Sequence, residues 1–583
     1  YNAMSLHKIN VPTPPLVGLR SSDRGFASCC LVDSTDTLDS IDTAEHIVFK
    51  MVAARAGIGY HLESRSIADP VRNGAFPHSG KLPYYRHIDR SVKANTQQTR
   101  GGSATVSYPY FDPEIIQLMQ VKQQRATDEN KIDKMDYSLS FNNLLLKRYL
   151  KNEDITLMSY FYAPEVHEAF YSDDEAKFEE IYVAAEKRVA SLTKIDHEGK
   201  TVPAAPKVSA KEILDTWLRI RMETGRMYAH HIGESNRHGN FLDPIRMTNL
   251  CVEITQPTRP FHHITELYKT KEQLDQMKPE DIGEVSLCNL GGVVLGRMES
   301  LAEWEKTCYI LLKFVDTIIE IQDYPFPTME YTAKKRRNVG IGLMNAAGAM
   351  AAEGLAYEGI EARNWIHREA EKLSYFLHKA SVRLAKEQGA CEWFDRTKPS
   401  KGTLVIDTYK KTVDELVSVG LEMDWESLRA DILKYGMRNS VLTAQMPGES
   451  SSVLLGVTNS IEPPRKIVSI KGSAVNKVIA IAPGATDWDT LMSYKLAYDI
   501  DRTEWIKWNA VYQKFLNQSS SFQMYYDYSK FENEIIPGPV VVRDFMTAVK
   551  YGIKTWYYAN FNTANGGGAG EEAAGCASGG CTI

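Results

Sequence analysis

The sequence has no long apolar run and no strong excess of either charge. Its apolar stretches are far shorter than the roughly 20 residues that a membrane-spanning helix needs, and no signal peptide opens the chain. The formal net charge is −6 over 583 residues, with a pI of about 6.2. No basic stripe favours a nucleic-acid polymer, although a nucleotide with a few phosphates is compatible with this charge. We expect a cytoplasmic protein.

Cysteine is also scarce. Eight cysteines in a chain of this length are too few for a disulfide scaffold, and no paired C-x-x-C motif predicts a zinc site. We therefore expect no metal on this chain, while a few thiols remain available for redox or radical chemistry. The chain is 43% apolar and 24% charged, which is typical of a globular protein with one large core.

The apolar periodicity indicates alternating helices and strands. It predicts helices at residues 210–228, 304–321, 363–387, 504–515 and 542–557. Short apolar runs predict strands at residues 28–32, 403–406 and 440–442. Buried strands followed by amphipathic helices indicate an α/β fold, in which ligand sites lie at strand ends and in the loops beyond them.

Two cysteines stand near the C-terminal end of the sequence. Cys576 and Cys581 lie in GCASGGCTI, behind a GGGAG run. Because such a tether cannot form a packed element, the pair is not part of a core. Two thiols on a flexible tether can carry reducing equivalents from an external reductant to an internal site. A metal-binding or incidental pair remains the alternative.

The motif NLCVE contains three residues with chemical potential. If the segment is extended, Asn249, Cys251 and Glu253 share one face and place an amide, a thiol and a carboxylate side by side. The alternative is a half-buried strand with an ordinary core cysteine. Two further cysteines, Cys29 in FASCCLV and Cys288 in GEVSLCNLGG, also lie in apolar runs bounded by turn residues, and they favour the chemical interpretation.

Two other motifs are ambiguous by themselves. MPGESSS, residues 446–452, combines a Pro-Gly turn with hydroxyls and suits phosphate binding at a helix start. A solvent loop that caps a helix would look the same, and Glu449 would repel an anion unless backbone donors outweigh it. The adjacent Tyr557 and Tyr558 in KTWYYANFN indicate amphipathic packing when taken alone.

Ten strings together resemble the large subunits of class I ribonucleotide reductases, in the order found there. They are FASCC, RAGIGY, TRGGSAT, NLCVEI, GEVSLCNL, EQGACEWF, MRNSVLTAQMPGESSS, NSIEPPR, WYYAN and GCASGGC. The resemblance spans residues 12–583. It implies an α/β barrel of ten strands, made of two antiparallel five-stranded parallel halves, with Cys251 on a central finger loop. NLCVE is then expected at a loop tip.

The resemblance also implies three units. They are a lead-in at residues 1–11, the catalytic barrel with appended helices at 12–562, and a flexible redox-active tail at 563–583. Residues 1–3, ahead of Met4, look like a cloning remnant.

A catalytic role follows from the resemblance for each matched residue. Cys251 would become the thiyl radical that abstracts the 3′ hydrogen of the ribose. Glu253 would accept the 3′-hydroxyl proton, and Asn249 would orient the substrate. Cys29 and Cys288 would donate reducing equivalents and end as a disulfide.

The tail and the tyrosines would connect this site to other proteins. Cys576 and Cys581 would reduce the active-site disulfide by exchange and be recharged by thioredoxin or glutaredoxin. Tyr558 would receive a radical from a metal-bearing small subunit and pass it through Tyr557 to Cys251. The three remaining cysteines are expected to be small core residues: Cys30, Cys308 and Cys391.

Nucleotide sites are also implied. The substrate would contact Thr13, Ser28, Gly57, Asn249, Glu253, Pro447, Gly448, Glu449, Ser450 and Ser451. A deoxynucleoside triphosphate or ATP effector would contact Asp36, Thr37, Leu38, Arg65 and Arg72, with the acid on the ribose and the arginines on the phosphates. The match at Arg65 needs a one-residue deletion. Residues 261–281 are longer than expected and predict a surface insertion.

Other function classes fit less well. An adenosylcobalamin-dependent reductase would have no use for the Tyr557–Tyr558 pair, and a glycyl-radical reductase would not need the tail dithiol. A regulatory or scaffold chain would lack catalytic residues, and none is missing. We therefore expect a homodimeric ribonucleoside-diphosphate reductase chain that needs a small subunit and contacts no membrane.

Family members carry a further region before the equivalent of Pro12, often with an ATP-binding cone. The sequence begins close to that point, either because it was cut there or because the gene is split. Such a barrel would expose apolar surface for another chain to cover. We expect a companion N-terminal polypeptide and no dATP inhibition through a cone on this chain.

Overall fold

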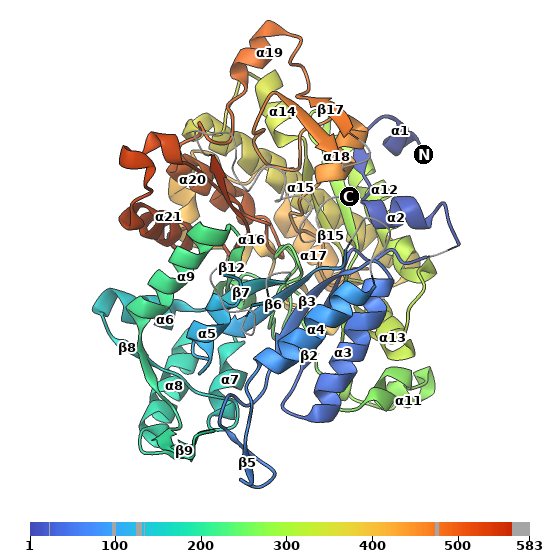
Figure 1. Ribbon diagram of the computed structural model, residues 1–583. Coiled ribbons are helices and arrows are strands. Elements are labelled where there is room, and N and C mark those ends of the chain that lie inside the picture. Colours follow the sequence, from blue (N-terminus) through green and yellow to red (C-terminus); the bar gives the residue numbers. More distant parts are fainter. Residues whose placement is uncertain (23, 96–100, 124–130, 133–134, 473–476, 563–583) are drawn as a thin grey trace.

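The computed structural model describes residues 1–22, 24–95, 101–123, 131–132, 135–472 and 477–562. Two parallel sheets lie at the centre, with helices packed around them (Figure 1). Among the described residues, no helix is long and apolar enough to cross a membrane.

The first half of the barrel contains five parallel strands in a continuous order. They are β2 (Cys29–Ser34), β3 (Gly57–Leu62), β6 (Ala104–Pro109), β7 (Asp136–Phe141) and β12 (Met227–His231). Every residue of these strands is buried, as expected for a parallel sheet covered on both faces. Helix α3 (Leu38–Ala53) packs on β2 and β3, and α4 (Leu82–Ala94) packs on α3 (Figure 1).

The second half contains β14 (Leu290–Val294) parallel to β15 (Gly340–Met344). Parallel bridges from Ile341 to Thr443 and from Gln445 to Ser520 extend it. Outside it lie the paired helices α12 (Leu301–Ile321) and α15 (Gly359–Gln388).

Antiparallel contacts join the two halves at both seams. β13 (Ser286–Cys288) pairs with β2 and leads directly into β14, while β19 (Thr555–Trp556) pairs with β12. The hydroxyls of Ser519 and Thr555 lie 2.7 Å apart and connect β19 to the second half. The expected α/β barrel class is therefore confirmed, whereas the count of ten strands stays a prediction because part of the second half consists of isolated bridges.

Several predicted elements end earlier than the periodicity indicates. The expected helix at 210–228 is α9 (Ala210–Thr224), which stops at Gly225 with a left-handed φ of 69°, and the residues beyond form β12. The expected helix at 542–557 is α21 (Gly538–Lys550), followed by Gly552 with φ 81° and by β19. The helix expected at 504–515 is α20 (Arg502–Gln513).

The strand predicted at 403–406 is wrong. Helix α16 (Val405–Thr408) begins there, because the Asp407 carboxylate accepts the amide hydrogen of Leu404 at 2.7 Å and closes a helical turn. Residues 440–442 are extended beside β15 without forming a named strand, and Ile341 donates to the Leu442 carbonyl at 2.8 Å. The predicted insertion at 261–281 contains only short helices at the periphery, including α11 (Lys271–Asp275).

The remaining elements surround the barrel. The strands are β1 (Ile9–Asn10), β4 (Pro70–Val71), β5 (Phe76–Pro77), β8 (Asp154–Thr156), β9 (Thr193–Ile195), β10 (Thr201–Pro203), β11 (Lys207–Ser209), β16 (Val468–Gly472), β17 (Lys477–Ile481), β18 (Met524–Asp527) and β20 (Ala559–Asn562). The helices are α1 (Asn2–Ser5), α2 (Thr13–Gly18), α5 (Ile115–Gln120), α6 (Asn143–Lys151), α7 (Pro164–Phe170), α8 (Glu175–Val189), α10 (Ile232–Arg237), α13 (Pro327–Arg336), α14 (Ala346–Ala352), α17 (Trp425–Tyr435), α18 (Glu449–Leu455) and α19 (Trp488–Ser493).

Candidate active site

NLCVE forms the tip of a buried loop rather than a strand, as the family resemblance implies. The Asn249 side-chain oxygen accepts the amide hydrogen of Ile254 at 3.0 Å, and its carbonyl accepts that of Val252 at 3.2 Å. Val252 has a φ of 60°, which turns the chain sharply. Cys251 and Glu253 are only 6% and 1% exposed, so the loop holds its thiol and carboxylate away from bulk water.

Strand β3 approaches this loop closely because two of its residues are glycines. A Cβ at Gly59 would lie 2.2 Å from the Thr248 carbonyl oxygen, and one at Gly57 would lie 2.7 Å from Leu250. The Thr105 hydroxyl on β6 donates to the Leu250 carbonyl at 2.8 Å. Side chains on β3 would displace the loop, so its position depends on these glycines.

Two cysteines face each other beside the loop. Cys29 on β2 is the register partner of Cys288 on β13, and the Asn249 amide donates to the Cys29 sulfur at 3.3 Å. Cys29, Cys251 and Cys288 share one buried cluster, whereas Cys30 belongs to the main core. Burial raises the pKa of the Cys288 thiol well above its usual range, and a hydrogen bond with Cys29 adds to this rise. The thiol is therefore protonated at neutral pH.

Cys308 and Cys391 lie away from this cluster. Cys308 packs in the main core, and the Cys391 sulfur lies 3.4 Å from the Ser440 hydroxyl. Burial raises the pKa of Cys391 to about 11.

Glu253 is a buried carboxyl with an unusual acidity. Burial raises its pKa to about 7, even though hydrogen bonds from its own backbone, Asn249 and Ser521 act in the opposite direction. No basic side chain forms a salt bridge with it among the described residues. A carboxyl that titrates near neutral pH can accept and return a proton during turnover.

An aromatic group reaches the loop from the two-residue connection between β19 and β20. The Tyr557 hydroxyl lies 3.5 Å from the Cys251 sulfur, and the Tyr557 and Tyr558 rings are 3.8 Å apart between centroids. Burial raises the pKa of Tyr557 well above its ordinary value, and the neighbouring Tyr558 adds to this. The packing predicted for WYYAN is present, and it brings the Tyr557 hydroxyl next to the Cys251 sulfur.

Three polar residues around the tyrosines were not predicted from the sequence. The Arg226 guanidinium lies 5.2 Å from the centroid of Tyr558, and it is 3.9 Å from the Asp136 carboxylate. The Tyr228 hydroxyl donates to Asp136 at 3.0 Å, and its ring is 4.9 Å from that of Tyr557. The three residues lie on or beside β7 and β12, and no local motif distinguishes them from ordinary strand residues.

The predicted phosphate loop forms the start of α18. Asn459 accepts the Gly448 amide hydrogen at 2.8 Å and donates to the Glu449 carboxylate at 2.8 Å, so that carboxylate has a local partner. The Asn10 amide donates to the Ser451 hydroxyl at 2.9 Å. The residue before Pro447, Met446, belongs to the same buried cluster as Cys251. The loop thus lies next to the candidate site.

Of the other expected substrate residues, Ser28 and Gly57 lie beside Cys288. Ser28 donates its amide hydrogen to the Cys288 carbonyl and accepts that of Gly57, both at 2.9 Å. Its hydroxyl is buried without a hydrogen-bond partner among the described residues. Thr13 begins α2, three positions after Asn10. A ligand between these elements would find an available hydroxyl.

The expected effector residues meet only in part. The Arg65 guanidinium holds the Asp36 carboxylate at 2.9 Å and donates to the Pro70 carbonyl at 2.6 Å. Thr37 caps α3, and Leu38 is 73% exposed. Arg72 occupies the nearby β4–β5 turn with a φ of 50°. Among the described residues, no hydrogen bond or ion pair joins Arg72 to the Asp36–Arg65 pair.

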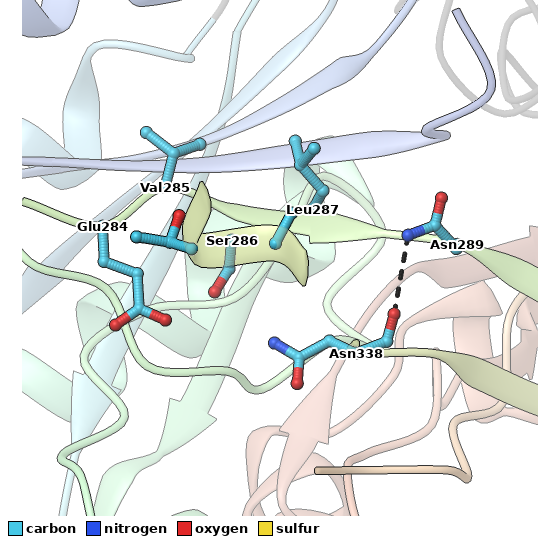
Figure 2. A pocket seen from close by; sticks show the side chains of 8 residues that line it. Glu284, Val285, Ser286, Leu287, Asn289 and Asn338 are labelled. Atoms are coloured by element: carbon cyan, nitrogen blue, oxygen red, sulfur yellow. Dashed lines mark hydrogen bonds between the residues drawn. The ribbon is translucent and has the colours of Figure 1, made fainter. Parts of the chain in front are cut away.

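The tail cysteines Cys576 and Cys581 lie outside the described residues. A small cavity beside β13 is lined by residues including Glu284, Ser286, Leu287, Asn289 and Asn338 (Figure 2). None of the three clustered cysteines lines it, so it is not the candidate site. The described residues contain no group of histidine, cysteine, aspartate and glutamate side chains arranged to hold a metal ion.

Comparisons with known proteins match almost the whole chain. A family model described as the ribonucleotide reductase barrel domain matches residues 27–559. The chain is 38% identical to the ribonucleoside-diphosphate reductase subunit alpha of Haemophilus influenzae, over 100% of this chain and 74% of the relative. Identity to the ribonucleoside-diphosphate reductase 1 subunit alpha of Escherichia coli is 37%, over 100% of this chain and 74% of the relative. Identity to the subunit alpha of phage T4 is 33%, over 97% and 72%.

Proposed function

The chain belongs to the ribonucleotide reductase family as a catalytic large subunit, and on that premise we propose that it reduces ribonucleoside diphosphates by thiyl-radical chemistry at Cys251. The observation that carries this proposal is the position of the Cys251 loop. Its sulfur lies 3.5 Å from the Tyr557 hydroxyl, while Asn249 of the same loop contacts Cys29. Tyr557, which would bring the radical, and the Cys29–Cys288 pair, which would supply the reducing electrons, therefore both lie beside the Cys251 loop.

Hydrogen-atom transfer would begin the reaction. A Tyr557 phenoxyl takes the hydrogen atom of Cys251, so that an O–H bond forms and an S–H bond breaks. The resulting thiyl radical takes the 3′ hydrogen of the ribose. Glu253 then accepts the proton of the 3′-hydroxyl, which its pKa of about 7 allows. Asn249 holds the substrate in position.

The two remaining site cysteines would supply the reduction. One thiol of the Cys29–Cys288 pair protonates the leaving 2′-hydroxyl, which departs as water. As the pair becomes a disulfide it gives two electrons, the second thiol proton ends on C2′, and Glu253 returns its proton to the 3′ oxygen. The product radical then recovers its 3′ hydrogen from Cys251. Thiol–disulfide exchange with Cys576 and Cys581 restores the pair, and thioredoxin or glutaredoxin recharges the tail.

Substrate phosphates would bind at residues 447–451, with Thr13, Ser28 and Gly57 lining the approach. The buried, unpartnered Ser28 hydroxyl supports this placement. A deoxynucleoside triphosphate or ATP would bind as an effector at residues 36–38, Arg65 and Arg72, where its phosphates would compete with Asp36 for the Arg65 guanidinium.

The proposal includes several partners. The radical would come from a separate metal-containing small subunit, and the large subunit would form a homodimer in the cytoplasm. The alternative source of the radical is adenosylcobalamin, and the adjacent Tyr557 and Tyr558 favour the small subunit because a cobalamin enzyme has no use for such a relay.

Deoxycytidine diphosphate formation tests the proposal. The chain is mixed with a dithiol, cytidine diphosphate, an effector and either a metal-loaded small subunit or adenosylcobalamin. Product is expected only with the small subunit. Product with adenosylcobalamin alone would overturn the assigned radical source, and no product under either condition would overturn the activity.

A further inference from the structure

Residues 516–522, here called the serine strap, contact the Cys251 loop along one side. The Ser521 hydroxyl lies 2.7 Å from the Cys251 carbonyl oxygen and 3.3 Å from the Glu253 carboxylate. The Ser519 amide donates to the Glu253 carbonyl at 2.9 Å. All of these residues are buried. The strap therefore fixes both the backbone and the carboxylate of the loop.

The other side of the serine strap contacts residues 555–557, which comprise β19 and the tyrosine that follows it. Tyr557 donates its amide hydrogen to the Phe522 carbonyl at 2.7 Å, and the Thr555 hydroxyl donates to the Ser520 carbonyl at 2.7 Å. One short piece of backbone thus connects the thiol and the phenol that must exchange a hydrogen atom.

Lys554 anchors the beginning of the serine strap. Its ammonium group is buried and donates to the carbonyls of Leu516 at 3.1 Å, Gln518 at 2.7 Å and His238 at 2.8 Å. It forms no salt bridge within the described part of the chain. Burying a charge without an opposite charge is costly unless fixed dipoles compensate it. Burial still lowers the pKa of Lys554 well below its usual range, so the carbonyls of the strap compensate the charge only in part. Their hydrogen bonds nevertheless hold the lysine and the strap together.

We propose that the serine strap is the positioning element that sets the contact between Tyr557 and Cys251, with Ser521 as its positioning residue and Lys554 as its anchor. The inference rests on the proposed function, in which the Tyr557 oxygen takes hydrogen from the Cys251 sulfur. The two atoms are already 3.5 Å apart, and a displacement of about 1 Å can slow a reaction by about 100-fold. A small shift of the strap would therefore slow turnover.

The chain offers a matched control for Ser521. The neighbouring Ser520 hydroxyl is also buried, but it has no hydrogen-bond partner among the described residues. Ser521→Ala and Ser520→Ala remove the same atom from adjacent positions of the strap. Ser521→Thr retains a hydroxyl and tests whether that group, rather than local packing, is required.

The experiment measures deoxycytidine diphosphate formation by the large subunit with its small subunit, as a function of pH. Ser521→Ala is expected to lower kcat at least about tenfold with little change in KM. The acidic limb of the kcat–pH profile of Ser521→Ala should also move to higher pH, because a hydrogen-bond donor that lowers the pKa of Glu253 has been removed. Ser521→Thr should recover most of the activity, and Ser520→Ala should behave as wild type.

A second variant tests the anchor. Lys554→Met is expected to lower kcat while substrate binding, followed by calorimetry, is retained. If Ser521→Ala matches Ser520→Ala in both kcat and pH profile, the proposed role of the strap is wrong. If Lys554→Met turns over at the wild-type rate, the proposed anchoring role of Lys554 is wrong. An inactive wild type would instead overturn the proposed function and this role with it.

Discussion

Lowering the pH should switch off turnover through Glu253. Burial raises the pKa of this carboxyl from 4.5 to about 7, and a general base acts only when it is ionised. Below pH 7, kcat should therefore fall by about tenfold for each pH unit. At about 1.4 kcal/mol per pH unit, the raised pKa means that burial disfavours the charged form by ~3 kcal/mol.

The free energy of unfolding should change with pH in the opposite sense to kcat. Because the folded-state pKa is raised, the neutral carboxyl gives a contribution to stability that is fully present below about pH 4.5 and is lost as the pH rises through about 7. Glu253→Gln is neutral at every pH. It should match wild type at pH 5 and exceed it at pH 8 by up to ~3 kcal/mol, visible as a higher Tm.

The assay combines kcat between pH 6 and 9 with thermal melts of wild type and Glu253→Gln at pH 5 and pH 8. The variant should be inactive at every pH. Glu462→Gln is a useful comparison, since burial also raises the pKa of Glu462, to about 8. Replacing this carboxyl should not move the fall of kcat near pH 7, because that fall is assigned to Glu253. A kcat that stays constant down to pH 6, or an equal Tm difference at both pH values, would refute the reasoning.

Two further predictions concern the thiols. Cys251→Ser should abolish turnover yet bind nucleotide normally in calorimetry, because the hydroxyl O–H bond is too strong to yield the radical; normal multiple turnovers would contradict this. Replacing Cys576 and Cys581 with serine should stop thioredoxin-driven turnover but leave one cycle from the prereduced Cys29–Cys288 pair, and a small dithiol should partly restore activity; a rapid-quench assay without even one turnover would show another role for the tail.

The local motifs predicted much of the site because its chemistry depends on a few residues that stand close together in sequence. NLCVE placed an amide, a thiol and a carboxylate within five positions, and they do lie together. The expected alternation did not produce a strand, because Val252 adopts a left-handed φ and the Asn249 side chain closes a turn. The loop form followed only from the family resemblance.

Other parts depended on contacts between distant segments. Arg226 lies beside Tyr558, and Ser521 touches Glu253, across separations that no periodicity can predict. The run of three serines at residues 519–521 was the only available signal for the strap. Helix ends were overestimated at 210–228 because the apolar pattern continues into β12, and only Gly225 marks the boundary.

Closure of the barrel at β19 has a consequence for how the chain folds. Arg221, just before β12, donates to the Tyr557 carbonyl from 336 residues away in sequence. Forming contacts between such distant segments carries a large loop-closure entropy and slows folding. Until residues after Thr555 have been synthesised, β12 has an unpaired edge that another chain could join. We therefore expect newly made chains to depend on chaperones, and to aggregate through that edge when they are expressed faster than the barrel can close.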